Sequence, residues 1–231
     1  ENDFVGCKCG IMDQLASAAG QADHALLIDC RTLAIETVPI PPGLEILIIN
    51  SNVRRGLVES EYNIRRQECE EAARALKVPA LRDATECDLN RLTETVTDLV
   101  FRRARHVVTE NERTLNTCAQ LRDDNREMLA ALMAASHRSL RDDFEVTVPQ
   151  LDLLVEWVSN RLGALGGVRM TGGGFGGCIV ALVPTGLVDS IKADVLDNYE
   201  RATGLQPTFY VCKASAGAQV IRSPSRHIDG R

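Results

Sequence analysis

A dense run of glycines lies between residues 172 and 177, where five of the six residues are glycine. The run comprises Gly172, Gly173, Gly174, Phe175, Gly176 and Gly177. Glycine reaches positive φ and lets another group approach the backbone closely, at a cost in conformational entropy. The run therefore predicts either a sharp turn without a ligand or a loop that presents its backbone to one. In the second case we expect valine at Gly174 to abolish activity at a modest cost in folding.

The residues after the run exclude two common phosphate-binding loops. Gly172, Gly174 and Gly177 satisfy the dinucleotide pattern G-x-G-x-x-G, but that pattern requires a helix directly after it. Here the apolar run 178–183 follows and ends at Pro184, which predicts a buried strand. No Lys-Ser or Lys-Thr pair follows, so the run is not a Walker loop either. We expect the glycine loop to join two strands.

Asp13 is the second residue whose setting could support chemistry. It lies between apolar residues at the start of an expected helix, shortly after Gly10. An acid at this position can simply favour the helix dipole. It can also be a carboxylate that takes a proton from a substrate hydroxyl. The residues alone leave both interpretations open.

The elements that would position these residues can be predicted from apolar periodicity. Strands are expected at 24–30, 34–40, 45–52, 168–170, 178–183 and 208–214, and helices at 59–77, 98–121, 128–140, 149–163 and 187–199. The order predicts an α+β sandwich of ferredoxin-like type, with helices on one face of a mostly antiparallel sheet. Within it, Cys30, Cys178 and Cys212 are expected to behave as small core residues.

Composition narrows the class of protein. The chain has 231 residues, 45% hydrophobic and 25% charged, with a net charge of −6. That balance disfavours nucleic acid and anionic membranes as partners, and no apolar run approaches the ~20 residues of a membrane span. Apart from Cys7 and Cys9 the eight cysteines are scattered, so we expect no metal site, a cytoplasmic location and a monomer.

Six segments, in order along the chain, resemble galactokinases of the GHMP kinase superfamily. They are CGIMDQ (9–14), HALLIDCR (24–31), INSNVRRGLVESEYNIRR (49–66), RHVVTEN (105–111), SHRSLRDDFEVTVPQLD (136–152) and GGVRMTGGGFGGCIVAL (166–182). The similarity extends to about Gly217 and is specific to galactokinases and their nearest relatives.

The resemblance implies a C-terminal GHMP kinase domain and ATP-dependent phosphorylation of the anomeric hydroxyl of α-D-galactose, with Mg²⁺. It implies that Asp13 faces that hydroxyl as the base, that Gly10 and Tyr62 contact the sugar, and that the glycine loop lies near the substrate. Phosphoryl transfer depends mainly on positioning and charge neutralisation, which fits such a site. Arg54 could steady phosphate charge, or belong to a solvated face paired with Glu59 and Glu61.

The chain departs from the family by lacking its first two motifs, the sugar-binding motif and the Ser-rich phosphate loop. Because the chain also begins at Glu1 without Met, we expect a C-terminal portion of a galactokinase that is inactive alone, with most ATP and Mg²⁺ ligands upstream. The expected domains are 1–22, the end of the N-terminal domain; 23–220, the C-terminal domain; and 221–231, a polar tail.

Three alternatives stay open at this stage. One is an N-acetylgalactosamine kinase, although Tyr62 favours galactose. The second is a non-catalytic galactose sensor derived from a galactokinase, which the intact Asp13 does not exclude. The third is a ferredoxin-like module that binds a small ligand through its glycine loop.

Overall fold

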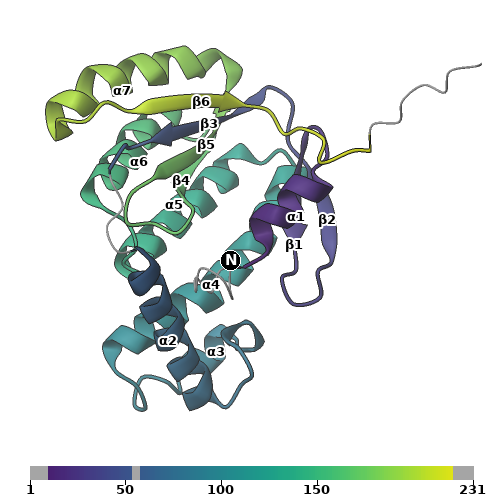
Figure 1. The fold of residues 1–231 in the computed structure, drawn as a ribbon, viewed down its shortest axis with the longest axis vertical. Coiled ribbons are helices and arrows are strands. Elements are labelled where there is room, and N and C mark those ends of the chain that lie inside the picture. Colours follow the sequence, from purple (N-terminus) through teal and green to yellow (C-terminus); the bar gives the residue numbers. More distant parts are fainter. Residues whose placement is uncertain (1–9, 54–57, 221–231) are drawn as a thin grey trace, which may run out of the picture.

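The computed structural model describes residues 10–53 and 58–220, which form a mixed helix and sheet structure (Figure 1). The elements in chain order are α1 (Met12–Ala19), β1 (His24–Ile28), β2 (Ile35–Pro39), β3 (Leu44–Asn50), α2 (Val58–Leu76), α3 (Glu86–Leu89), α4 (Asp98–Arg122), α5 (Arg126–Asp142), α6 (Pro149–Leu162), β4 (Gly167–Thr171), β5 (Cys178–Pro184), α7 (Val188–Thr203) and β6 (Thr208–Cys212). Each strand and long helix predicted from periodicity is present, and the α+β class is confirmed. The four-residue helix α3 was not predicted.

The main sheet has four strands in the order β4-β5-β3-β6, and every neighbouring pair is antiparallel. Asn50 at the end of β3 pairs with Cys178 at the start of β5, and Thr171 at the end of β4 pairs with the same residue. The glycine loop, which joins β4 to β5, therefore lies at the same end of the sheet as the last residue of β3. Residues after β3 and residues of the loop must meet there.

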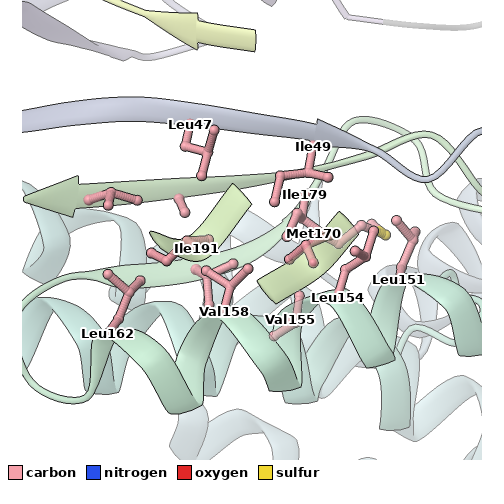
Figure 2. Close-up of a cluster of buried hydrophobic side chains, with 14 of the residues drawn as sticks. Leu47, Ile49, Leu151, Leu154, Val155, Val158, Leu162, Met170, Ile179 and Ile191 are labelled. Carbon is pink, nitrogen blue, oxygen red and sulfur yellow. The ribbon is translucent and has the colours of Figure 1, made fainter. Parts of the chain in front are cut away.

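One face of this sheet forms the main hydrophobic core with α6 and α7 (Figure 2). Side chains at alternate positions, such as Leu47 and Ile49 in β3 and Ile179 in β5, point towards Leu154 and Val158 of α6. All five are fully buried. Apolar side chains that repeat every two residues in the strands pack against apolar side chains that repeat about every 3.6 residues in the helices, as the sequence pattern predicts.

Two details of the predicted architecture were wrong. β1 and β2 form a separate two-stranded sheet, so only β3 of the early strands joins the main sheet. Helices also lie on both sides of the main sheet: α5 packs along β4, and Leu182 on the second face contacts a buried cluster that includes Leu129 and Met133 of α5. Apolar periodicity identifies which residues are buried but not which element covers them.

The cysteines behave differently from the prediction. Cys30 is exposed in the turn after β1, while Cys178 and Cys212 are half-buried. Cys118, in α4, is the buried one among the described cysteines. Cys30 comes after the last strand residue, Ile28, where the chain turns towards β2 and leaves the packed layer.

Candidate functional site

The glycine loop is a compact turn in which five of its six residues have positive φ. The values are 79° at Gly172, 81° at Gly174, 57° at Phe175, 120° at Gly176 and 85° at Gly177. Residues other than glycine are strained in this region, which explains the composition of the loop. At its end, the carbonyl oxygen of Gly177 accepts hydrogen bonds from the backbone N–H and the hydroxyl of Ser51, both at 2.8 Å.

Gly174 and Gly176 lie against the protein's own backbone. An ideal Cβ at Gly174 would lie 2.2 Å from the carbonyl oxygen of Val146, and one at Gly176 would lie 2.9 Å from that of Val53. At Gly173, in contrast, no heavy atom lies within 4 Å of an ideal Cβ. The sequence-based expectation that valine at Gly174 would cost little in folding was therefore wrong. Gly173 is the loop position with open space beside it.

Phe175 anchors the loop. Its N–H donates a hydrogen bond of 2.7 Å to the carbonyl oxygen of Val146. Its ring packs against the main core, and the guanidinium carbon of Arg65 lies 5.7 Å from the ring centroid. That distance is within the range of a cation–π contact. The loop is thus fixed between the segment that follows α5 and helix α2.

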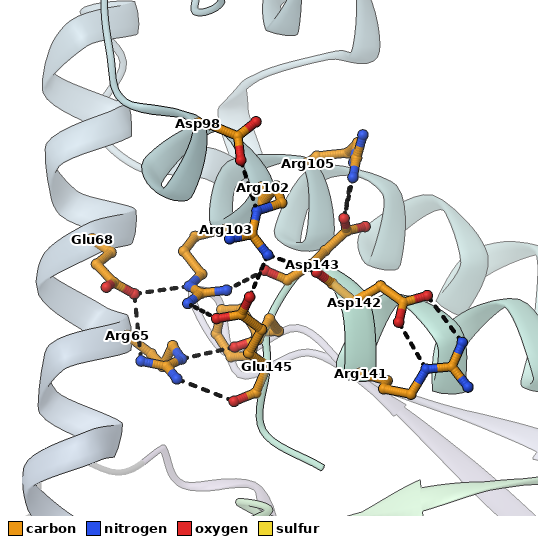
Figure 3. Close-up of polar contacts among 11 residues, drawn as sticks. Arg65, Glu68, Asp98, Arg102, Arg103, Arg105, Arg141, Asp142, Asp143 and Glu145 are labelled. Carbon is orange, nitrogen blue, oxygen red and sulfur yellow. Dashed lines mark hydrogen bonds and ion pairs between the residues drawn. The ribbon is translucent and has the colours of Figure 1, made fainter. Parts of the chain in front are cut away.

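A network of charges around the buried side chain of Arg103 holds the segment that supports the loop (Figure 3). The side chain of Arg103 is 2% exposed; its Nε donates to Glu68 at 2.9 Å and its Nη2 to Glu145 at 2.7 Å. Arg65 donates to the carbonyl oxygens of Phe144 at 2.7 Å and Glu145 at 3.1 Å. Hydrogen bonds from Arg103, and then from Arg102, lower the pKa of the Glu145 carboxyl to about 2. Glu145 itself has a φ of 53°, so the network stabilises a strained turn beside the loop.

Sequence reasoning did not assign this network, although a signal for it existed. Arg103 lies three residues after Val100 and four before Val107, within the apolar stripe of α4. A charged residue in such a stripe is rarely buried unless it is paired. Its partners, Glu68 and Glu145, are 35 and 42 residues away in the chain. Their identity could come only from the tertiary structure.

Asp13 lies in the first turn of α1 and is exposed to solvent. No residue of α1 is buried, and no side-chain hydrogen bond caps its N-terminus. Asp13 is therefore placed favourably for the helix dipole and is free of a burial cost. Gly10, also exposed, precedes the helix, and no heavy atom lies within 4 Å of its ideal Cβ.

The far end of α1 is held by the C-terminal segment. The N–H of Gly217 donates to the carbonyl oxygen of Gly20 at 2.7 Å, and that of Ala218 donates to Ser17 at 3.0 Å. Cβ atoms at Gly20 and Gly217 would lie under 3.0 Å from backbone atoms, so small residues are required where these two segments meet. These contacts fix the end of α1 opposite Asp13.

The remaining predicted site residues are on or near α2. Tyr62 is half-buried on α2, one helical turn before Arg65, whose guanidinium lies over Phe175. The structure thus places Tyr62 and the glycine loop beside the same helix. Arg54 lies outside the described residues, as do Cys7 and Cys9.

His106, Ser139 and Asp143 form a chain of hydrogen bonds that could be mistaken for a nucleophilic triad. The Ser139 hydroxyl donates a hydrogen bond of 3.0 Å to the Asp143 carboxylate. Nδ1 of His106 lies 3.0 Å from the hydroxyl oxygen of Ser139. A nucleophilic serine would instead donate to the histidine. Burial lowers the pKa of His106 to about 4, and its ring stacks on Phe144 at 4.4 Å. The trio is structural, joining α4 to α5.

The described residues offer no metal site and no membrane-spanning helix. Within 10–53 and 58–220, no three His, Cys, Asp or Glu side chains gather closely enough to hold a metal ion. None of the helices in the same ranges is both long and apolar enough to cross a bilayer.

Comparison with known proteins identifies the fold. Residues 119–201 match the family model for the C-terminal domain of GHMP kinases. The Lactococcus lactis galactokinase complexed with galactose superposes with a TM-score of 0.87 and 36% sequence identity, over 94% of this chain. The L. major mevalonate kinase in complex with R-mevalonate shares the fold, with a TM-score of 0.51 and 15% identity over 80% of this chain. The chain spans 57% of the length of that galactokinase and 47% of that mevalonate kinase.

Proposed function

Because the chain carries the C-terminal domain of the GHMP kinases, we propose that it contributes this domain to an ATP-dependent sugar kinase that phosphorylates the anomeric hydroxyl of galactose. One observation carries the proposal: 36% identity over 94% of the chain to a galactokinase whose structure contains galactose. The glycine loop also lies within residues 119–201, which match the family model for the C-terminal domain of GHMP kinases. A shared fold alone would not specify a sugar.

In the proposed reaction, the anomeric oxygen attacks the γ-phosphorus of ATP. A P–O bond forms, the bond to the ADP leaving group breaks, and the hydroxyl proton passes to the carboxylate of Asp13. An exposed carboxylate at a helix start can approach a bound sugar without moving buried structure. Gly10 and Tyr62 are proposed to contact the sugar, and Arg54 to steady phosphate charge.

The glycine loop is proposed to border the substrates through Gly173, where there is open space. The other glycines shape the loop, and the charge network behind Phe175 keeps it rigid. Rigid positioning is the main contribution that a protein makes to phosphoryl transfer.

ATP and Mg²⁺ are proposed cofactors, and among the described residues no three His, Cys, Asp or Glu side chains gather to hold a metal ion. Magnesium would neutralise phosphate charge during transfer. We assign its ligands to residues outside those described. The cytoplasmic location and monomeric state also stay predictions.

The test is galactose-dependent release of ADP. Two proteins should be compared: the 231-residue chain, and the same chain joined to an N-terminal region that carries the two missing motifs. We expect turnover only from the joined protein, with galactose preferred to N-acetylgalactosamine. Turnover by the 231-residue chain that is lost in Asp13→Asn would refute its dependence on the upstream motifs.

Two outcomes favour the alternatives. Preference for N-acetylgalactosamine would indicate the related kinase. Saturable galactose binding by the joined protein, with ADP release no faster than without sugar, would indicate a sensor.

A further inference from the structure

A cavity of about 310 Å³ lies on the second face of the main sheet, away from the α6–α7 core. Ile46 of β3 and Val180 and Leu182 of β5 line it from the sheet, and Leu26 of β1 and Met133 of α5 line it from the other elements. Ligand pockets have volumes of ~300–1,000 Å³, so this one suits a small molecule. None of its lining residues belongs to α1, α2 or the glycine loop, so it is separate from the proposed kinase site.

One end of this cavity carries charge. Glu110 and Arg113 of α4 and Arg169 of β4 line it there, together with Ser136. Arg169 donates through Nη1 to Glu110 at 2.8 Å, and Arg113 donates through Nε to the other carboxylate oxygen at 2.7 Å. Ser136 also donates to Glu110. One carboxylate thus faces two guanidinium groups.

The cluster has one positive charge in excess and has unused donors. Arg169 directs Nε to the carbonyl oxygen of Met170, and Arg113 directs Nη2 to the hydroxyl of Thr109. Within the described part of the chain, this leaves Nη2 of Arg169 and Nη1 of Arg113 without a hydrogen-bond acceptor. The Arg113 side chain is 18% exposed and that of Arg169 33% exposed. Donors of a partly buried guanidinium bind anionic oxygen strongly, because water screens them little.

From the apolar walls and the charged end, we propose that this cavity binds a small amphipathic monoanion, namely a carboxylate with an unbranched aliphatic tail. The carboxylate accepts hydrogen bonds from Arg113 and Arg169 and balances the excess charge. The tail lies between β5 and α5 and removes apolar surface from water. An uncharged ligand would leave the two donors unpaired, and a dianion would exceed the single excess charge.

The test uses octanoate as the probe and 1-octanol as its uncharged match, with the full 231-residue chain labelled at its methionine methyl groups for NMR. Met133 lines the cavity, Met170 points into the core on the opposite face, and Met128 is exposed at 47%. We expect octanoate to shift the Met133 resonance saturably, with one site per chain, and to leave Met170 and Met128 unshifted. Octanol should bind about tenfold more weakly.

Three variants separate the contribution of the Arg169 charge to binding from that of the cavity volume. Arg169→Gln should weaken octanoate binding about tenfold and leave octanol unchanged, while Arg169→Lys should retain most of the octanoate affinity. Val180→Phe should fill the cavity and abolish the binding of both probes. Thermal midpoints of each variant establish that it is folded.

The proposal is overturned if octanoate shifts exposed Met128 as strongly as Met133, which would show non-specific adsorption. Equal affinities for octanoate and octanol in the unmodified chain would also overturn it, whether or not Arg169→Gln folds. So would undiminished octanoate binding to folded Val180→Phe. None of these readouts depends on kinase activity, so failure here is distinguishable from failure of the proposed function.

Discussion

The glycine loop and helix α1 carry the main candidate site residues, yet the chain supports them in opposite ways. Two backbone hydrogen bonds hold the loop: the N–H of Ser51 donates to Gly177, and the N–H of Phe175 donates to Val146. The ring of Phe175 also packs against the core and contacts the guanidinium of Arg65. Helix α1 buries no side chain, and the contacts described for it lie at its C-terminal end. The loop is therefore a product of tertiary packing, whereas Asp13 depends mainly on local helix geometry.

This difference shows how sequence signals for function should be weighed. Most of the glycines in the loop are explained by positive φ or by close approach of the chain's own backbone. They would be needed even if no ligand bound there. Among the described residues, Asp13 has no ion-pair partner, which leaves the helix dipole as its structural role there. The exposed acid is thus a stronger indicator of chemistry than the more conspicuous glycine run.

The largest effect is expected at Asp13, measured in the active joined protein. Asp13→Asn keeps the side-chain size but cannot accept a proton, so kcat should fall about 10²–10⁴-fold. Because Asp13 is exposed, the thermal midpoint should change little. Steady-state kinetics and a thermal melt on the same preparation check both statements. A kcat close to that of the unmodified protein would remove Asp13 from the base role.

The next effect concerns Gly174 and is on folding. Gly174→Val combines a strained φ with overlap of the Val146 backbone, so it should destabilise the chain by about 2–5 kcal/mol. Urea denaturation measures this directly. Gly174→Ala should be destabilising as well, because its Cβ meets the same carbonyl oxygen. Unchanged stability in both variants would contradict the packing described for the loop.

Gly173→Val is the matched variant that separates substrate contact from structure. Gly173 has open space and no positive φ, so Gly173→Ala should change stability by less than about 1 kcal/mol. If the loop borders the substrates, Gly173→Val should lower kcat/KM of the joined protein more than Gly173→Ala does, with little change in thermal midpoint. Full activity in Gly173→Val would make the whole loop a structural turn.

A pH effect of up to about 3 kcal/mol is expected from His106. Burial lowers its pKa from 6.5 to about 4, although Glu110 and Asp143 act to raise it, while Arg113 and Arg169 add to the lowering. Between these values the unfolded chain binds the proton and the folded chain does not, so stability falls as pH falls from 6.5 to 4. Denaturation of the unmodified chain and His106→Gln at pH 7.5 and pH 5 tests this. The same acid sensitivity in both proteins would assign it to other groups.

The smallest effect is expected at Ile11, the residue directly before α1. Ile11 is 42% exposed, so Ile11→Ser should change the stability of the 231-residue chain by less than about 0.5 kcal/mol. Leu154→Ala, at a fully buried position in α6, should cost about 2–5 kcal/mol and serves as the comparison. A large loss in Ile11→Ser, seen by urea denaturation, would show that α1 is packed more firmly than described.

The sequence by itself determined the strands, the long helices and the face of each that packs against the core. Strands and long helices follow from apolar periods of two and 3.6, because a side chain's face is set by local backbone geometry. The side chains of Thr97 and Asn125 cap α4 and α5 by accepting hydrogen bonds from backbone N–H groups three residues further on, which is also a local interaction. The order of motifs further indicated the GHMP kinase C-terminal domain.

Only the tertiary structure decided which elements meet. Separation of the β1–β2 sheet, the pairing of Arg103 with Glu68 and Glu145, and the collision that requires glycine at 174 all join residues far apart in the chain. Local propensity carries no information on such partners. Their choice depends on which burial satisfies all the apolar faces and charges of the chain at once.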